Sequence, residues 1–143
     1  MGKAGSAMSI ASATSPHAVR LIEAAAELAP TINALSDEIE RERRLPEGLV
    51  EKLRKLGFFS LWLAKDFGGP ELSVTDFVRV IEALARHDGS VGWCASVAAT
   101  YSFFSGFLPE PVARRIFVND KAAVAGNLHP IGKAEVVEGG YRV

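Results

Sequence analysis

The chain has 143 residues, which is enough for one domain with a substantial buried core. Its 16 Lys and Arg side chains nearly balance 17 Asp and Glu, and the formal net charge of -1 excludes a polybasic nucleic-acid platform. Apolar residues make up 48% and charged residues 23%, a composition that excludes a disordered chain. The single cysteine cannot form a disulfide within the chain, so we expect a reducing, cytoplasmic location.

The chain is expected to begin with a tail and a long helix. Residues 1–15, mostly Gly, Ala, Ser and Met, predict a disordered tail. Pro16 opens a helix that reaches about Arg43, because a proline at the first helical position costs no hydrogen bond. Apolar residues recur at intervals of four and three, which predicts one wall of a helical bundle, with a coiled-coil interface as the alternative. These residues are Leu21, Ala25, Leu28, Ile32, Leu35 and Ile39.

Two shorter helices follow. Pro46 starts a second helix that ends at Gly57, and a buried apolar run at 58–63 leads into a glycine-rich turn at 66–70. A capping box at 73–76 starts the third helix. The residues expected to face inward are Leu49, Val50, Leu53 and Leu56 on the second helix, and Phe77, Ile81, Leu84 and Ala85 on the third.

The stretch 89–109 carries no charged residue, which raises the question of a membrane span. Its glycines and hydroxyl side chains dilute its hydrophobicity, so we expect no membrane partner. Instead, Asp88 caps a fourth helix at 89–107 that is buried on most sides at the centre of the bundle. A short fifth helix follows Pro111, with Val112, Ile116 and Phe117 facing inward.

After residue 120 the pattern changes from helix to strand. The sequence predicts a short buried strand at 122–125, a loop at 126–132, a strand at 133–137, a turn at 138–140 and a return strand at 141–143. Two strands alone are marginal in water, and domain boundaries normally fall in linkers. We therefore expect the chain to be the front part of a longer protein, with a small flap on the bundle as the alternative.

Several short motifs occur in a fixed order along the chain. They are Leu45-Pro46-Glu47, Leu56-Gly57-Phe58-Phe59, Phe67-Gly68-Gly69, the run 81–90, and Pro130-x-Gly132 ahead of 137–143. From about residue 44 onward this set resembles the N-terminal helical domain of the acyl-CoA dehydrogenase superfamily. The resemblance implies a mainly α fold: a helical bundle at 16–120, followed at 121–143 by the first strands of a truncated β-domain.

Two branches of that superfamily compete. Dehydrogenases usually carry Thr-Glu-Pro and then Gly-Ser-Asp, where this chain has Leu128-His129-Pro130 and Gly132-Lys133-Ala134. Together with Gly92-Trp93 and Ala125-Gly126, this departure is more similar to the flavin-dependent monooxygenase branch, whose members hydroxylate aromatic compounds with reduced flavin and O2. An acyl-CoA dehydrogenase, oxidising the acyl CH–CH bond with FAD, is the first alternative. A non-catalytic helical interaction module is the second.

The resemblance also implies a cofactor, partners and site residues. The flavin, FAD or FMN, would lie where a helical domain, a β-domain and a C-terminal helical bundle meet. The full-length form would be a homotetramer, with a separate flavin reductase as a partner that supplies reduced flavin. The fragment alone would be inactive. By position, Asn127, Leu128 and Pro130 would contact the flavin, and His129 would polarise a phenol as the catalytic residue.

The fourth helix supplies the candidates for substrate binding, because an apolar helix with a few hydroxyls suits a site that excludes water. They are Trp93, Thr100, Tyr101 and Phe104, with core packing as the alternative for each. Cys94, on the same helix, is expected to be an inert buried residue. No Cys, His and carboxylate spacing fits a metal site, and no Gly-x-Gly-x-x-Gly or P-loop motif occurs.

Overall fold

The computed structural model describes residues 14–119, 121–126, 129 and 132–143. This part of the chain is mainly α-helical, as predicted, and the expected tail at 1–15 lies outside it except for Thr14 and Ser15. The elements are α1 (Pro16–Glu42), α2 (Glu47–Leu56), η1 (Lys65–Phe67), α3 (Val74–Ala85), α4 (Gly89–Tyr101), η2 (Ser102–Phe107), α5 (Glu110–Phe117), β1 (Glu135–Val137) and β2 (Gly140–Arg142), where η denotes a 3₁₀ helix.

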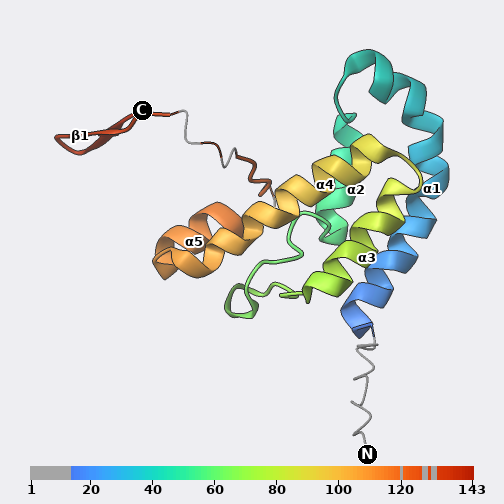
Figure 1. Cartoon of the computed structure of the whole chain (residues 1–143), viewed down its shortest axis with the longest axis horizontal. Helices are drawn as coiled ribbons and strands as arrows, with labels where there is room; N and C mark the ends of the chain where they lie inside the picture. The colour runs from blue at the N-terminus through green and yellow to red at the C-terminus, as the bar shows by residue number, and fades with distance from the viewer. Residues whose placement is uncertain (1–13, 120, 127–128, 130–131) are drawn as a thin grey trace, which may run out of the picture.

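The helices form a bundle in which α3 is the middle layer. One side of α3 packs along α1 and the other along α4, while α2 contacts α1 (Figure 1). The predicted seam of α1 is confirmed, because five of its six residues are buried and Leu35 is partly buried against the same core. The seam therefore contacts neighbouring helices of the same chain, which favours the bundle over the coiled coil.

The second helix ends in a tight reversal that decides which residue is buried. Gly57 adopts a φ of 91°, and the Phe58 N–H donates to the Leu53 carbonyl at 3.0 Å. This Schellman arrangement turns the chain inward at Phe58, which is fully buried. The prediction that Leu56 faces inward is wrong: Leu56 is the last residue of α2 and is 43% exposed.

The pairing of α3 with α4 depends on a close backbone approach. A Cβ at Gly92 would lie 2.5 Å from Ala85 Cβ, so only glycine fits at this crossing without movement. On α3 the buried residues are Asp76, Phe77, Val80 and Leu84. The expected inward position of Ala85 is wrong, since this end residue is exposed, and Ile81 is partly buried.

The fourth helix is shorter and less enclosed than predicted. It ends at Tyr101 and continues as the 3₁₀ helix η2. Five of its residues are buried, whereas Trp93 is 71% exposed and Phe107 on η2 is 69% exposed. The charge-free composition gave no indication of this asymmetry, because it depends on which neighbours pack against the helix. No helix in the described part of the chain is long and apolar enough to cross a membrane.

Two buried serines of η2 hold the loop that follows α2. Ser102 Oγ accepts a hydrogen bond from the Trp62 N–H at 3.2 Å, and Ser105 Oγ accepts one from the Ala64 N–H at 3.4 Å. The Trp62 ring stacks on Phe77, with the ring centroids 4.2 Å apart. The two hydroxyls therefore satisfy part-buried backbone donors of the loop.

The C-terminal part differs from the prediction in one element. Residues 122–126 form no strand, because they line cavities beside α4 without a strand partner among the described residues, and they are exposed or partly buried rather than buried. The hairpin is confirmed, with β1 antiparallel to β2 and Val136 opposite Tyr141. Figure 1 shows it set apart from the helices. On α5 the buried residues are Ala113 and Phe117, so the inward prediction is wrong for Ile116, which is 37% exposed.

An ionic cluster joins the starts of α1 and α3. Ser73 Oγ caps α3 by accepting from the Asp76 N–H at 3.1 Å, but the Asp76 carboxylate turns away and accepts from the Ser15 N–H at 3.1 Å. Arg79 donates to Asp76 at 3.5 Å and to Thr14 Oγ1 at 2.6 Å. Burial alone would raise the pKa of Asp76, but the Ser15 hydrogen bonds and the Arg79 charge outweigh it and lower the pKa.

Candidate functional site

An apolar groove runs along the exposed side of α4, between the α1–α2 linker and the extended segment 123–125. We call it the α4 groove, and its volume is about 460 Å³. Its lining is mostly aliphatic and aromatic and includes no carboxylate. The lining residues are Arg43, Arg44, Leu45, Val50, Phe59, Trp93, Cys94, Val97, Ala98, Ala123, Val124 and Ala125.

Trp93 forms an exposed aromatic wall of the α4 groove. Its neighbour Gly92 faces α3, so the next residue along the helix, rotated by about 100°, points away from the bundle. An indole ring that is 71% exposed on a folded helix is an unusual surface feature, since burying such a ring is favourable. The groove therefore offers a large apolar surface to a ligand or to another part of the protein.

Arg43 and Arg44 lie where the α1–α2 linker borders the α4 groove. Arg43 is the C-terminal cap of α1 and adopts a left-handed conformation with a φ of 52°. Arg44 follows it, and neither side chain makes an ion pair or hydrogen bond within the part of the chain that the structure describes. A smaller adjoining cavity of about 290 Å³ shares both arginines and also includes Glu40 and Ser90.

Cys94 lies beside Trp93 on the same groove. The prediction that Cys94 is buried is wrong, because Cys94 is exposed on the side of α4 that borders the groove. Partial burial of the thiol and the nearby charge of Asp88 raise its pKa, so the neutral thiol is favoured at neutral pH.

The comparisons with known proteins agree with this architecture. The profile of the family described as acyl-CoA dehydrogenase, N-terminal domain, matches residues 15–105. The chain belongs to this family. The matched region includes α1 to α4 and most of η2, and therefore the helix that carries Trp93 and Cys94.

Curated relatives of this N-terminal domain are named as monooxygenases. The chain is 34% identical over 111 residues to an indole-3-acetate monooxygenase of Acinetobacter baumannii, covering 77% of the chain and 28% of the relative. It is 29% identical over 123 residues to the oxygenase component of a p-hydroxyphenylacetate 3-hydroxylase of the same species, covering 85% and 29%. An FADH2-dependent resorcinol hydroxylase of a Rhizobium species is 28% identical over 131 residues, covering 91% and 32%.

The chain thus spans less than a third of the length of these relatives. What their names say about substrates and components describes those whole proteins.

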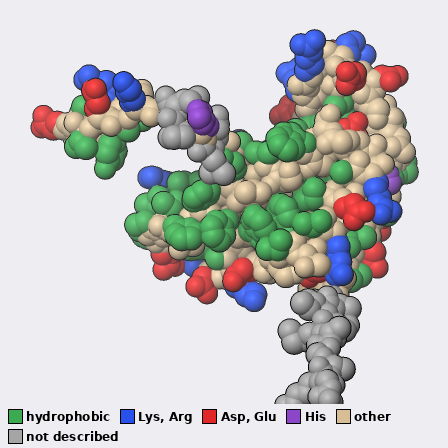
Figure 2. Space-filling view, in the orientation of Figure 1, with side chains coloured by type: hydrophobic (Ala, Val, Ile, Leu, Met, Phe, Trp, Pro, Cys, Tyr) green, Lys and Arg blue, Asp and Glu red, His purple; other side chains and the backbone are tan. Residues whose placement is uncertain are grey.

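Of the four predicted substrate residues in the domain, Trp93 alone lines the α4 groove. Thr100 is partly buried. The rings of Tyr101 and Phe104 stack with their centroids 5.7 Å apart. Tyr101 also lies directly against Gly126, because a Cβ at that position would be 2.7 Å from the Tyr101 ring. Hydrophobic side chains gather over this end of the molecule (Figure 2). The structure therefore separates the candidates into a groove residue and an aromatic cluster further along the helix.

The predicted cofactor loop is mostly outside the described residues. Asn127, Leu128 and Pro130 are among the residues that the structure does not describe, and His129 is exposed. Within the described residues no group of three His, Cys, Asp or Glu side chains is placed to hold a metal ion.

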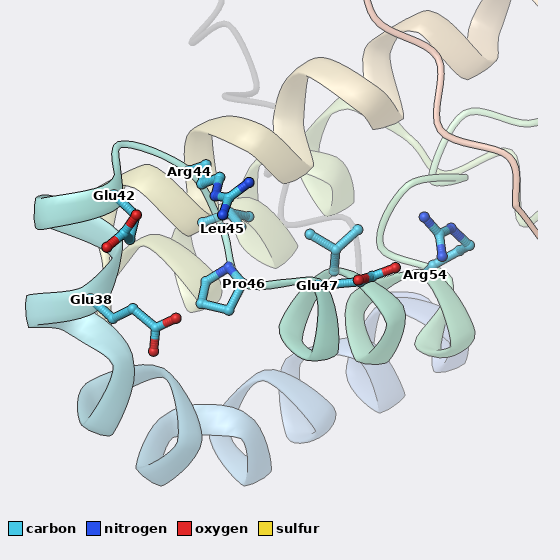
Figure 3. A pocket seen from close by; sticks show the side chains of 8 residues that line it. Glu38, Glu42, Arg44, Leu45, Pro46, Glu47 and Arg54 are labelled. Carbon is cyan, nitrogen blue, oxygen red and sulfur yellow. The ribbon is translucent and has the colours of Figure 1, made fainter.

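A second cavity, between the end of α1 and α2, has a different chemistry. Its volume is about 510 Å³, and three glutamates and two arginines line it with Leu45, Pro46 and Val50 (Figure 3). The glutamates are Glu38 and Glu42 from α1 and Glu47 from α2. Arg44 borders both this cavity and the α4 groove. The mixed charges make it a poor site for an aromatic molecule, despite its larger volume.

Sequence reasoning missed most of the groove. Phe59, Val97 and the two arginines were not among the predicted site residues, although all four line it. One available signal was the junction Arg43-Arg44-Leu45-Pro46, where a helix must stop before proline and the last residues turn outward. Periodicity could not show that this junction lies across from α4.

Proposed function

We propose that this domain is the N-terminal part of the oxygenase component of a two-component flavin-dependent monooxygenase that hydroxylates a small aromatic compound. The observation that carries the proposal is the α4 groove: an apolar cavity beside an exposed tryptophan, in a domain whose relatives are named monooxygenases of aromatic compounds. The domain would extend over residues 16–120, with the start of a β-domain at 121–143.

The proposal gives each candidate residue a role. Trp93 would stack on the substrate ring, because aromatic faces offset against each other are favourable. Thr100, Tyr101 and Phe104 would contact the substrate further along α4, and His129 would hold or polarise its hydroxyl. Asn127, Leu128 and Pro130 would contact the flavin.

The described residues fit one side of a flavin site. Gly126 leads into the proposed flavin loop and lies directly against the Tyr101 ring, and the stacked Tyr101 and Phe104 are partly exposed beside it. A flat apolar surface of this kind suits the isoalloxazine ring of FAD or FMN. When bound and reduced, the flavin would supply the reaction with O2. The residues of this chain would orient the substrate and exclude water.

The proposal also specifies partners. A separate flavin reductase would supply the reduced flavin, as the names of relatives called oxygenase components suggest. The complete protein would be a homotetramer. The single cysteine is consistent with a reducing compartment, and we place the protein in the cytoplasm on that ground.

The test uses the complete protein that contains this domain. Reduced flavin is supplied by a flavin reductase, and O2 uptake is measured together with the hydroxylated product of indole-3-acetate, p-hydroxyphenylacetate and resorcinol. We expect product from at least one of them, and a Trp93→Ala variant should lose most of it while a Trp62→Phe variant retains it. Oxidation of an acyl-CoA with an artificial electron acceptor, and no hydroxylated product, would overturn the proposal in favour of a dehydrogenase.

A further inference from the structure

We propose that the α4 groove selects aromatic carboxylates, with Arg43 and Arg44 binding the carboxylate and Trp93 the ring. The inference rests on the proposed function and narrows it, since the named relatives include enzymes for both acidic and neutral aromatic compounds. It depends on the juxtaposition of an unpaired cationic pair and an exposed indole in one cavity.

The charges around the groove favour an anion. Its lining contains two guanidinium groups and no carboxylate. Five other arginines are paired with acids: Arg41 with Glu42, Arg79 with Asp76, Arg86 with Glu82, Arg114 with Glu110 and Arg142 with Glu135. Arg20, Arg54 and Arg115 form no ion pair with an acid among the described residues, but none of them lines the groove. Arg43 and Arg44 have no such partner in the described chain, so their planar donors are available for a carboxylate.

The backbone at Arg43 supports a role for its side chain. The residue has a φ of 52° at the end of α1, where glycine is preferred because it has no Cβ to strain. A left-handed non-glycine residue costs free energy, and such positions concentrate at functional sites. A positive charge near the C-terminus of α1 stabilises the helix through its dipole. Arg41, in the last turn, already provides such a charge, so the dipole alone does not explain an arginine at position 43.

The adjoining cavities make Arg43 the stronger candidate of the two. Arg44 also borders the cavity with Glu38, Glu42 and Glu47, and these carboxylates compete for its charge. Arg43 borders the α4 groove and the smaller cavity, in which Glu40 is the single acid. The groove volume of about 460 Å³ lies within the range of cavities that hold small ligands.

The experiment measures binding to the complete protein by isothermal titration calorimetry. The probes are indole-3-acetate and p-hydroxyphenylacetate, each compared with its neutral counterpart, 3-methylindole or p-cresol. The wild-type protein should bind the carboxylates about 10- to 100-fold more tightly, the ratio expected for hydrogen bonds between charged groups. Arg43→Gln should remove most of this preference and leave binding of the neutral probes unchanged, with a smaller effect from Arg44→Gln.

Two further variants keep the test decisive. Arg43→Gly removes the charge at a position where glycine suits the backbone, so a loss of carboxylate preference in this variant cannot come from misfolding. Arg41→Gln removes a neighbouring charge that pairs with Glu42 outside the groove and should retain the preference. Equal binding of acidic and neutral probes to the wild type overturns the inference alone if hydroxylation still occurs. Absence of any hydroxylation overturns the proposed function instead.

Discussion

The backbone N–H of Ser15 donates a hydrogen bond to Oδ2 of Asp76 at 3.1 Å, across 61 positions of sequence. This contact joins the N-cap of α1 to the first turn of α3, and Arg79 donates to the other carboxylate oxygen, Oδ1, at 3.5 Å. The helix α3 packs against both α1 and α4. The Asp76 carboxylate, which holds the start of α3, therefore also helps to position α4 and the groove along it.

Replacing this carboxylate by an amide should destabilise the domain. Asp76→Asn keeps the shape but loses the charge that attracts the Ser15 N–H and Arg79, and hydrogen bonds to charged groups contribute about 1.5–3 kcal/mol. We expect a decrease of that size in the free energy of unfolding, measured by urea denaturation. The matched control is Asp37→Asn, at an exposed position of α1. It should change the free energy of unfolding by less than about 0.5 kcal/mol.

The lowered pKa of Asp76 predicts a specific pH dependence. Because the folded-state pKa lies below the unfolded one, the carboxylate contributes its full stabilisation above the unfolded pKa, about 4. That contribution decreases as the pH falls through the folded pKa. Urea midpoints measured from pH 6 downward should therefore decline more steeply for the wild type than for Asp76→Asn. Parallel curves would show that another group controls acid stability.

The α3–α4 crossing predicts intolerance of a methyl group. In Gly92→Ala the new Cβ would lie 2.5 Å from Ala85 Cβ and 2.8 Å from its Cα, so the helices must separate. Overpacking of this kind costs about 1–3 kcal/mol. Gly48→Ala on α2 is the control, since nothing lies within 4 Å of its Cβ position, and it should be neutral or stabilising by up to about 1 kcal/mol.

Removing the hydroxyl of Ser102 should loosen the loop after α2. Ser102→Ala leaves the part-buried Trp62 N–H without its acceptor, at a cost of about 1–3 kcal/mol. Amide hydrogen exchange should accelerate at Trp62. Ser96→Ala, whose hydroxyl donates only to the carbonyl of Trp93 on its own helix, should leave that exchange rate unchanged. Unchanged protection of Trp62 in both variants would contradict the assigned role.

The thiol of Cys94 offers a chemical readout of the groove. Burial and the Asp88 charge raise its pKa, so alkylation by iodoacetamide should become fast only at a higher pH than for a free cysteine. Asp88→Asn keeps the N-terminal cap of α4, because asparagine caps helices as well as aspartate, but removes the charge. The pH profile of alkylation should therefore move toward lower pH in this variant, without returning fully to the ordinary value.

The sequence by itself determined the helices and their order. Apolar spacing along α1, the proline before α2, the serine cap of α3 and the aspartate cap of α4 act over a few residues, so their consequences can be predicted locally. The motifs at 44–143 also indicated the family, as the match at 15–105 confirms.

Only the tertiary structure decided which faces of those helices are covered. The exposure of Trp93 and Cys94, the use of Ser102 by a distant loop, and the position of Arg43 across from α4 all depend on contacts between segments far apart in the chain. A charge-free helix has no polar side to mark its outer face, so periodicity carries no information about its orientation. The groove exists because one side of α4 packs against α3 while the α1–α2 linker and the segment 123–125 border the other.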